Sequence, residues 1–244
     1  PGCRQSIIFP RETLKKLYDF VYKDYPNNEI SCYLYLEKHG KNFKIYVNDD
    51  SVFVGEGVTI SPPSRGKLYI DCHTHPPFAY KQFNTNIGYP SRGDYKTILN
   101  SILKHKQPFH ILPTKEGIYI IQMNIGAIEK YNQNSDKERL FKMYNNWIND
   151  EFSYSKEDLK IPTKKISGSW ISNPDDYVNF INKKKLFHLT YIRWSRSYGW
   201  NQQNRVNTFH ENKIQIELYN CLLLLGKTYN FIYKLGYDYS SSSI

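Results

Sequence analysis

Cysteine is scarce in this chain, and long apolar runs are missing from it. The 244 residues contain four cysteines, none of them in a C-x-x-C pair: Cys3, Cys32, Cys72 and Cys221. Such scattered cysteines are typical of a reducing compartment rather than of a disulfide framework. No charged-then-apolar leader opens the chain, and no apolar run approaches the length of a membrane span. We therefore expect a soluble intracellular protein, cytoplasmic or nuclear.

A concentrated basic segment is also missing. Lys and Arg number 33 against 23 Asp and Glu, a net charge of +10, but both halves of the chain share the excess. A diffuse excess favours solubility and weak attraction to acidic surfaces over a nucleic-acid-binding face. One stretch keeps nucleic acid open as a partner, because residues 193–200 interleave arginines with aromatic side chains, as a base-stacking surface does. We favour cation–π packing within the fold for this stretch.

Two histidines and an aspartate form the most informative pattern. His73 and His75 follow a predicted strand over residues 68–72, and Asp94 lies near the start of a predicted helix. Residues i and i+2 of a strand face the same way, so both imidazoles can reach one ion. Two nitrogen donors and one oxygen donor are the three-ligand set of an open catalytic zinc site. The combination predicts a metal site at His73, His75 and Asp94.

Two further residues are candidates for the chemistry. Glu29 enters a predicted strand over residues 30–36 and could act as a base; a solvated strand end or a capping partner is the structural alternative. Glu37 is its rival, but lies at the far end of that strand, beside a turn. Ser91 precedes Asp94 by three residues, a spacing that also predicts a capping box at a helix start.

Glu29, the H-T-H-P run at residues 73–76 and the S-x-x-D of residues 91–94 together resemble the signature of the JAMM (MPN-plus) metalloisopeptidase family. That signature is a glutamate, then H-[ST]-H-P, then S-x-x-D, and the resemblance covers about the first half of the chain. It implies that His73, His75 and Asp94 bind one catalytic zinc. It further implies that Glu29 is the general base and that Ser91 helps to bind the oxyanion.

The resemblance also implies a substrate. In that family the bond cut is the isopeptide between the C-terminus of ubiquitin, or a ubiquitin-like protein, and a lysine. The same chemistry would cut an ordinary peptide, and the catalytic residues do not distinguish the two. Two alternatives stay open: a catalytically silent MPN-like scaffold, and a JAMM-like protein acting on nucleic acid. Silent relatives usually lose at least one of the residues that this chain keeps.

The chain departs from the family pattern at three places, one of which is Asp71-Cys72 where an apolar pair usually precedes the first histidine. The family usually has Cys-Gly shortly after its glutamate, where this chain has Ser31-Cys32-Tyr33. Pro76–Gly93, between His75 and Asp94, is longer than is usual and rich in aromatic residues, so it is either a substrate-gripping insertion or a lid. No further Cys/His cluster resembles the second zinc site of the lysine-63-specific members, so chain-type specificity is not implied.

The predicted elements indicate a layered fold. A strand at 7–9 and an amphipathic helix at 14–22 precede strands at 30–36, 43–47, 52–60 and 68–72, a helix after Asp94, and strands at 109–112 and 118–123. Helices flanking a mixed, largely antiparallel sheet make an α+β, three-layer α/β/α domain, which we place at residues 1–128. The resemblance implies an MPN/cytidine-deaminase-like sheet for it. For residues 129–244 we predict a mostly helical extension that can bind a protein partner, with a last helix over 214–235 and a disordered serine run at its end.

Overall fold

The computed structural model describes residues 6–40, 42–55, 70–82, 88–105, 107–152, 164–166, 169–171, 173–194 and 213–217. The α-helices within these ranges are α1 (Arg11–Asp19), α2 (Pro77–Gln82), α3 (Arg92–Leu103), α4 (Ile125–Gln133), α5 (Lys137–Glu151) and α6 (Pro174–Lys183). The π-helical turn η1 (Phe20–Asp24) continues α1, and the short 3₁₀ turn η2 spans Asp49–Ser51. None of the helices in the described part has the length and apolar character needed to cross a membrane.

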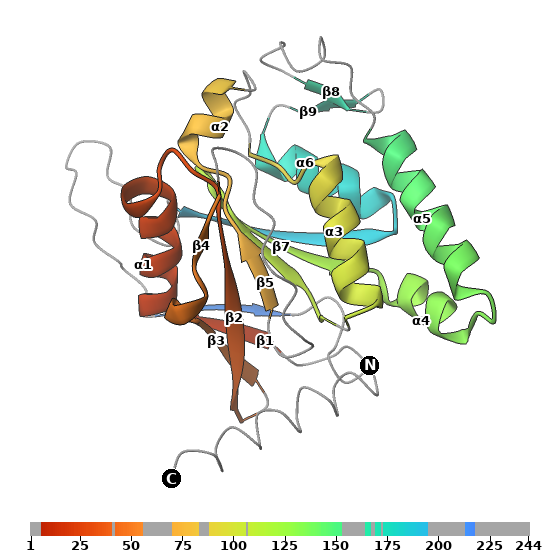
Figure 1. Ribbon diagram of the computed structural model, residues 1–244, viewed down its shortest axis with the longest axis horizontal. Helices are drawn as coiled ribbons and strands as arrows, with labels where there is room; N and C mark the ends of the chain where they lie inside the picture. Colours follow the sequence, from red (N-terminus) through yellow and green to blue (C-terminus); the bar gives the residue numbers. More distant parts are fainter. Residues whose placement is uncertain are drawn as a thin grey trace.

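A curled mixed sheet forms the centre of the fold (Figure 1). Its strands are β1 (Ser6–Pro10), β2 (Ile30–His39), β3 (Asn42–Val47), β4 (Phe53–Val54), β5 (Ile70–His73), β6 (His110–Pro113), β7 (Gly117–Met123), β10 (Phe187–Arg193) and β11 (Lys213–Glu217). The order is β10-β7-β6-β5-β2-β3-β1-β11, with β4 beside β2. The pairs β1–β3 and β5–β6 are parallel and the others antiparallel. A separate hairpin joins β8 (Lys164–Ile166) to β9 (Ser169–Ile171).

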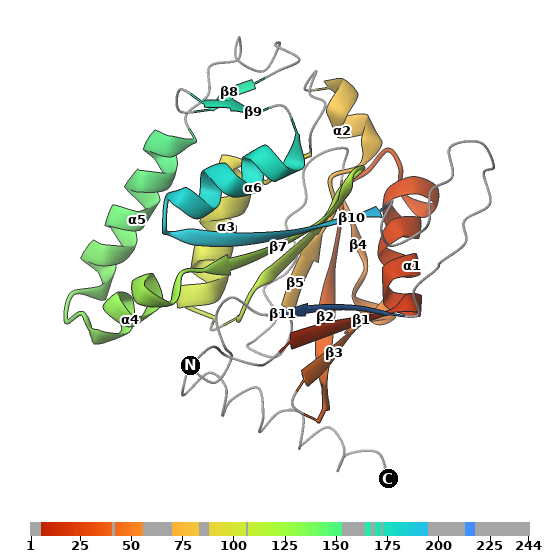
Figure 2. The same cartoon turned by 180° about the vertical axis from the view of Figure 1, so that it is seen from behind.

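Helices lie on both faces of this sheet, as Figure 2 shows from behind. Leu14 and Leu17 of α1 pack on one face with Ile118 and Ile120 of β7. The intervening Tyr119 points to the other face, into a second core that α3, α5 and α6 share. Alternate residues of β7 thus enter opposite cores, as the two-residue period of a strand requires. The prediction of an α+β fold with a helix layer on each face of a mixed sheet is confirmed.

The second half of the chain contributes strands to this same sheet. β10 pairs with β7 at one edge, and β11 pairs with β1 at the other. The predicted last helix over 214–235 is therefore wrong at its start, where Lys213–Glu217 is a strand; its remainder and the serine run lie outside the described residues. Helices α5 and α6 also belong to this half. The domain boundary between residues 128 and 129 stays a prediction.

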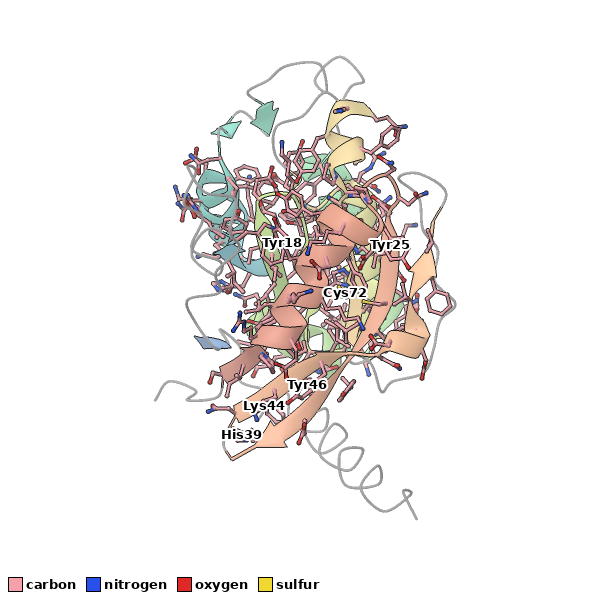
Figure 3. All side chains as sticks on the ribbon, turned by 90° about the vertical axis from the view of Figure 1, so that its left-hand side faces the viewer. Tyr18, Tyr25, His39, Lys44, Tyr46 and Cys72 are labelled. Carbon is pink, nitrogen blue, oxygen red and sulfur yellow. The ribbon has the colours of Figure 1, made fainter. Side chains whose placement is uncertain are left out.

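The β2–β3 hairpin extends the sheet away from its centre. Figure 3 shows His39 at the tip of this hairpin, with Lys44 and Tyr46 along it, and Cys72 much deeper, behind α1. Cys72 is 1% exposed and packs in the core beneath α1. Because side chains alternate along β5, the next residue, His73, faces the opposite layer, where α3 begins.

Candidate metal centre

The structure brings His73, His75 and Asp94 together at the C-terminal end of β5 and the N-terminal turn of α3. His73 Nε2 lies 3.0 Å from Asp94 Oδ1, and His75 Nε2 lies 3.4 Å from Asp94 Oδ2. One ligand atom from each residue falls within 4.8 Å of the others. The side chains are only 12% to 16% exposed. Such a largely buried group of two imidazoles and a carboxylate could hold a metal ion.

Thr74, the residue between the two histidines, ties this group to β2. Its backbone N–H donates to Ile30 O at 2.9 Å, and its hydroxyl oxygen accepts from Ile30 N–H at 3.1 Å. On the other side, His75 N–H donates to Pro113 O of β6 at 2.9 Å. The ligand segment is thus fixed between two strands, and the start of β2 is fixed against it.

This arrangement places Glu29 at the site. Glu29 immediately precedes the Ile30 that Thr74 binds, is 9% exposed, and has Oε1 3.8 Å from His75 Nε2. Burial raises the pKa of Glu29 to about 7, against the opposing influence of His75 and His73. A carboxylate with a pKa near neutrality can both accept and release a proton at physiological pH, which is what general-base catalysis requires.

Ser91 is the N-cap of α3, and the predicted capping box is present. Its hydroxyl oxygen accepts from Asp94 N–H at 3.2 Å, while Ser91 N–H donates to the Asp94 carboxylate. Asp94 therefore combines capping through Oδ2 with contacts to both imidazoles. The Ser91 O–H is not used by the cap and stays available as a donor, which leaves its predicted oxyanion role a prediction.

The long segment between His75 and Asp94 contributes to the site. His75 Nδ1 lies 3.2 Å from the carbonyl oxygen of Gly88, an arrangement in which Nδ1–H donates and Nε2 faces Asp94. Gly88 and Tyr80 are both held by the half-buried Glu116: Gly88 N–H donates to its Oε2 at 3.4 Å, and the Tyr80 hydroxyl donates to it at 2.5 Å. The described ends of this segment thus fix the orientation of a ligand; residues 83–87, including Phe83, lie outside the described part.

His110 of β6 is a member of the site that the sequence analysis missed. It is 3% exposed, and its Nε2 lies 2.8 Å from His73 Nδ1. Burial, together with the charge of His73, lowers the pKa of His110 well below its usual range, so this imidazole is neutral at pH 7. The one signal in the sequence was a histidine inside an otherwise apolar predicted strand.

The residues fit a bound cation. His73 Nε2 is buried and lies close to Asp94, yet it has no hydrogen-bond partner with suitable geometry among the described residues. A buried ring nitrogen without a hydrogen bond costs free energy unless another partner, such as a metal, takes its lone pair. The donor set of imidazoles and carboxylate is one that zinc and related divalent ions accept.

Asp94 and His75 stabilise each other's charged forms in the absence of metal. Burial opposes ionisation of Asp94, but His73 and His75 hold the pKa of this carboxyl well below its usual range. Burial also lowers the pKa of His75, but the hydrogen bond and charge of Asp94, with the charge of Glu29, outweigh it and raise that pKa to about 9. In the metal-free protein, His75 is therefore a positively charged imidazolium at pH 7, with a proton on each ring nitrogen.

Metal affinity should consequently rise with pH. A nitrogen that binds a metal must first lose its proton. Below a pH of about 9, metal binding therefore has to displace a proton from His75. Release of one proton predicts an increase of about tenfold in affinity per pH unit between pH 6.5 and 8.5. Competition with a chromophoric chelator measures it, and an affinity independent of pH over this range would contradict the protonated state of His75.

Other candidate residues lie apart from the site. Trp194 is 3% exposed, and its indole N–H donates to Thr114 O at 2.8 Å, so it belongs to the core and cannot stack on a base. Arg193 forms an ion pair with Asp175, and the rest of the arginine-aromatic stretch lies outside the described residues. Cys72 faces Cys32 across β2 and β5 as a buried free thiol.

Comparisons with protein-family models, with curated proteins and with solved structures each find no match to this chain. Its function therefore has to be argued from the site.

Proposed function

We propose that the chain is a zinc-dependent hydrolase of the JAMM (MPN-plus) kind, which cuts isopeptide bonds between ubiquitin or a ubiquitin-like protein and a lysine. The observation that carries the proposal is the convergence of His73, His75 and Asp94 with a second carboxylate, that of the buried Glu29, 3.8 Å from His75. A structural metal site uses all its positions for protein ligands, whereas three ligands beside a free base suit hydrolysis.

The residues divide the chemistry between them. Zinc, when held by His73, His75 and Asp94, supplies a Lewis acid that acidifies water and polarises a carbonyl group. Glu29 accepts the proton of the water that attacks the amide carbon, and then gives this proton to the departing lysine amine. The Ser91 O–H donates a hydrogen bond to the oxyanion that develops on the carbonyl oxygen.

Burial raises the pKa of Glu29 to about 7 in the metal-free site, which favours proton exchange by this carboxyl near neutral pH. A much stronger acid would not take up the proton of water, and a much weaker one would not release it to the amine. The support for zinc over other ions is the donor set, since two imidazoles and one carboxylate are typical of catalytic zinc. Support for the isopeptide as substrate comes from the resemblance of the motif.

Two substrates test the substrate class. The full chain, loaded with zinc, is given a ubiquitin–lysine isopeptide reporter and a linear peptide of the same sequence around the scissile bond. We expect cleavage of the isopeptide reporter that a chelator abolishes. Cleavage of the linear peptide alone would retain the metallohydrolase but reject the isopeptide, and cleavage of neither substrate by zinc-loaded protein would reject hydrolysis of both.

The two roles of Ser91 can be separated by substitution. Ser91→Ala removes both the cap and the hydroxyl and should lower the free energy of unfolding by about 1 kcal/mol, whereas Ser91→Gly should cost only a few tenths. If the hydroxyl binds the oxyanion, both variants should lose about 10²- to 10³-fold in kcat, irrespective of stability. Chemical denaturation and single-turnover cleavage measure the two effects. Activity that follows stability, with Ser91→Gly close to the parent, would leave Ser91 as a cap alone.

A further inference from the structure

His110 is the one described side chain that contacts a metal ligand through a ring nitrogen without belonging to the ligand set. Its Nε2 lies 2.8 Å from His73 Nδ1, and the two ring planes are tilted by 52° with centroids 4.9 Å apart. At this distance one ring must donate an N–H and the other must accept it, since two N–H groups or two lone pairs would repel each other.

The fold places His110 there through strand pairing. β5 and β6 are parallel neighbours in which Cys72 pairs with Ile111, and both of these side chains belong to the core beneath α1. The residues next to them, His73 and His110, therefore face the opposite layer together. His110 is 3% exposed, so water does not compete for this contact.

The other nitrogen of His110 has no such role. Nδ1 is buried and, among the described residues, has no hydrogen-bond partner. If Nε2 accepts a hydrogen bond, Nδ1 carries the ring proton, and this unpaired N–H costs free energy that the contact with His73 has to outweigh. Within the described part, the polar contact that this ring makes is the one with His73.

We propose that His110 is a positioning residue for the ligand His73: its Nε2 accepts the Nδ1 proton of His73 and so leaves the lone pair of His73 Nε2 for the metal. A ligating imidazole is neutral and carries its proton on the nitrogen that does not bind. Most ligating histidines donate that proton to a carboxylate or a carbonyl group. His75 does so to Gly88 O, whereas His73 uses a second imidazole.

The inference rests on the proposed metal-dependent function, and its test uses zinc affinity rather than cleavage. His110→Leu removes the acceptor and keeps an apolar side chain in the core, while His110→Gln keeps an acceptor in the form of its amide oxygen. We expect His110→Leu to weaken zinc binding by the 10- to 100-fold typical of such supporting residues, and His110→Gln to restore most of the loss. Thermal unfolding of the metal-free variants reports stability separately.

The outcomes separate the inference from the function. Weaker zinc binding by His110→Leu with rescue by His110→Gln supports the inference, even if no substrate is cut. Equal zinc affinity in the parent and in His110→Leu overturns it while leaving the hydrolase intact, and a parent that binds no zinc overturns both.

A measurement on the parent decides the point if His110→Leu fails to fold. Nitrogen-15 NMR of the zinc-loaded full chain should show a proton on His73 Nδ1, coupled through the hydrogen bond to an unprotonated His110 Nε2. A proton on His110 Nε2 in the loaded protein would overturn the inference, because His73 would then be the acceptor.

Discussion

Replacement of Glu29 by glutamine should lower cleavage of the isopeptide reporter by about 10²- to 10⁴-fold, the contribution that a positioned general base makes. Glutamine has nearly the same shape but cannot accept the proton of the attacking water. Glu29 lies 3.8 Å from His75 and is outside the ligand group, so zinc content should stay that of the parent. Single-turnover cleavage and elemental analysis of the same preparation measure the two quantities.

Glu37→Gln is the matched control for this experiment. Glu37 lies in β2, the strand that Glu29 precedes, but is exposed and pairs with Lys44 near the hairpin end, so its loss should leave turnover unchanged. Equal activity in Glu29→Gln and the parent would remove Glu29 from the mechanism. A loss of zinc together with activity would instead make Glu29 a fourth ligand.

His75→Ala should abolish metal binding under conditions where the parent is saturated. This substitution removes one of the three proposed ligands, and replacing even a supporting residue costs about 10- to 100-fold in affinity, so a greater loss is expected here. The metal-free protein should still fold, because His75 N–H and its neighbour Thr74 hold the segment through backbone bonds. Zinc titration followed by competition with a chelator measures the affinity.

His39→Ala is the control for histidine loss in general. His39 is exposed at the tip of the β2–β3 hairpin, and Figure 3 shows it far from Cys72, the residue that precedes His73. This variant should bind zinc as the parent does. If His39→Ala and His75→Ala lost zinc equally, or if neither lost it, the metal would lie elsewhere in the chain.

The grouping of His73, His75 and Asp94 could be predicted from the sequence because its information is local. His73 and His75 are two residues apart at the end of a strand, and Asp94 is set by the capping box that begins α3. Glu29 required a longer step, since only the family motif connected it to the histidines. The structure supplies the physical connection in Thr74, whose two hydrogen bonds to Ile30 join β2 to the ligand segment.

The supporting residues could not be predicted because their positions depend on which strands become neighbours. His110 reaches His73 only because β6 lies parallel to β5, and no spacing in the sequence encodes that pairing. The contact of Gly88 with His75 depends on Glu116, which lies in the turn between β6 and β7. The carboxylate of Glu116 accepts hydrogen bonds from both Gly88 and Tyr80. These are tertiary contacts between segments that are distant in the chain.

The incorrect prediction of a helix from residue 214 has a different cause. Residues 213–217 read Lys-Ile-Gln-Ile-Glu, a strict alternation of polar and apolar residues that is typical of a strand. The leucines at 222–225 favour a helix, and the predicted helix extends from them back to residue 214. The period of two was present in the sequence, and pairing with β1 at the sheet edge is what it encodes.

The most direct test of the central claim is the metal content of the purified full chain after zinc loading and removal of excess ion, measured beside His75→Ala. The site predicts one zinc per chain in the parent and none in the variant, because His73, His75 and Asp94 are the proposed ligand group. A parent that retains no zinc, or a variant that retains as much as the parent, would contradict the assignment of these residues as a metal centre and the hydrolytic function built on it.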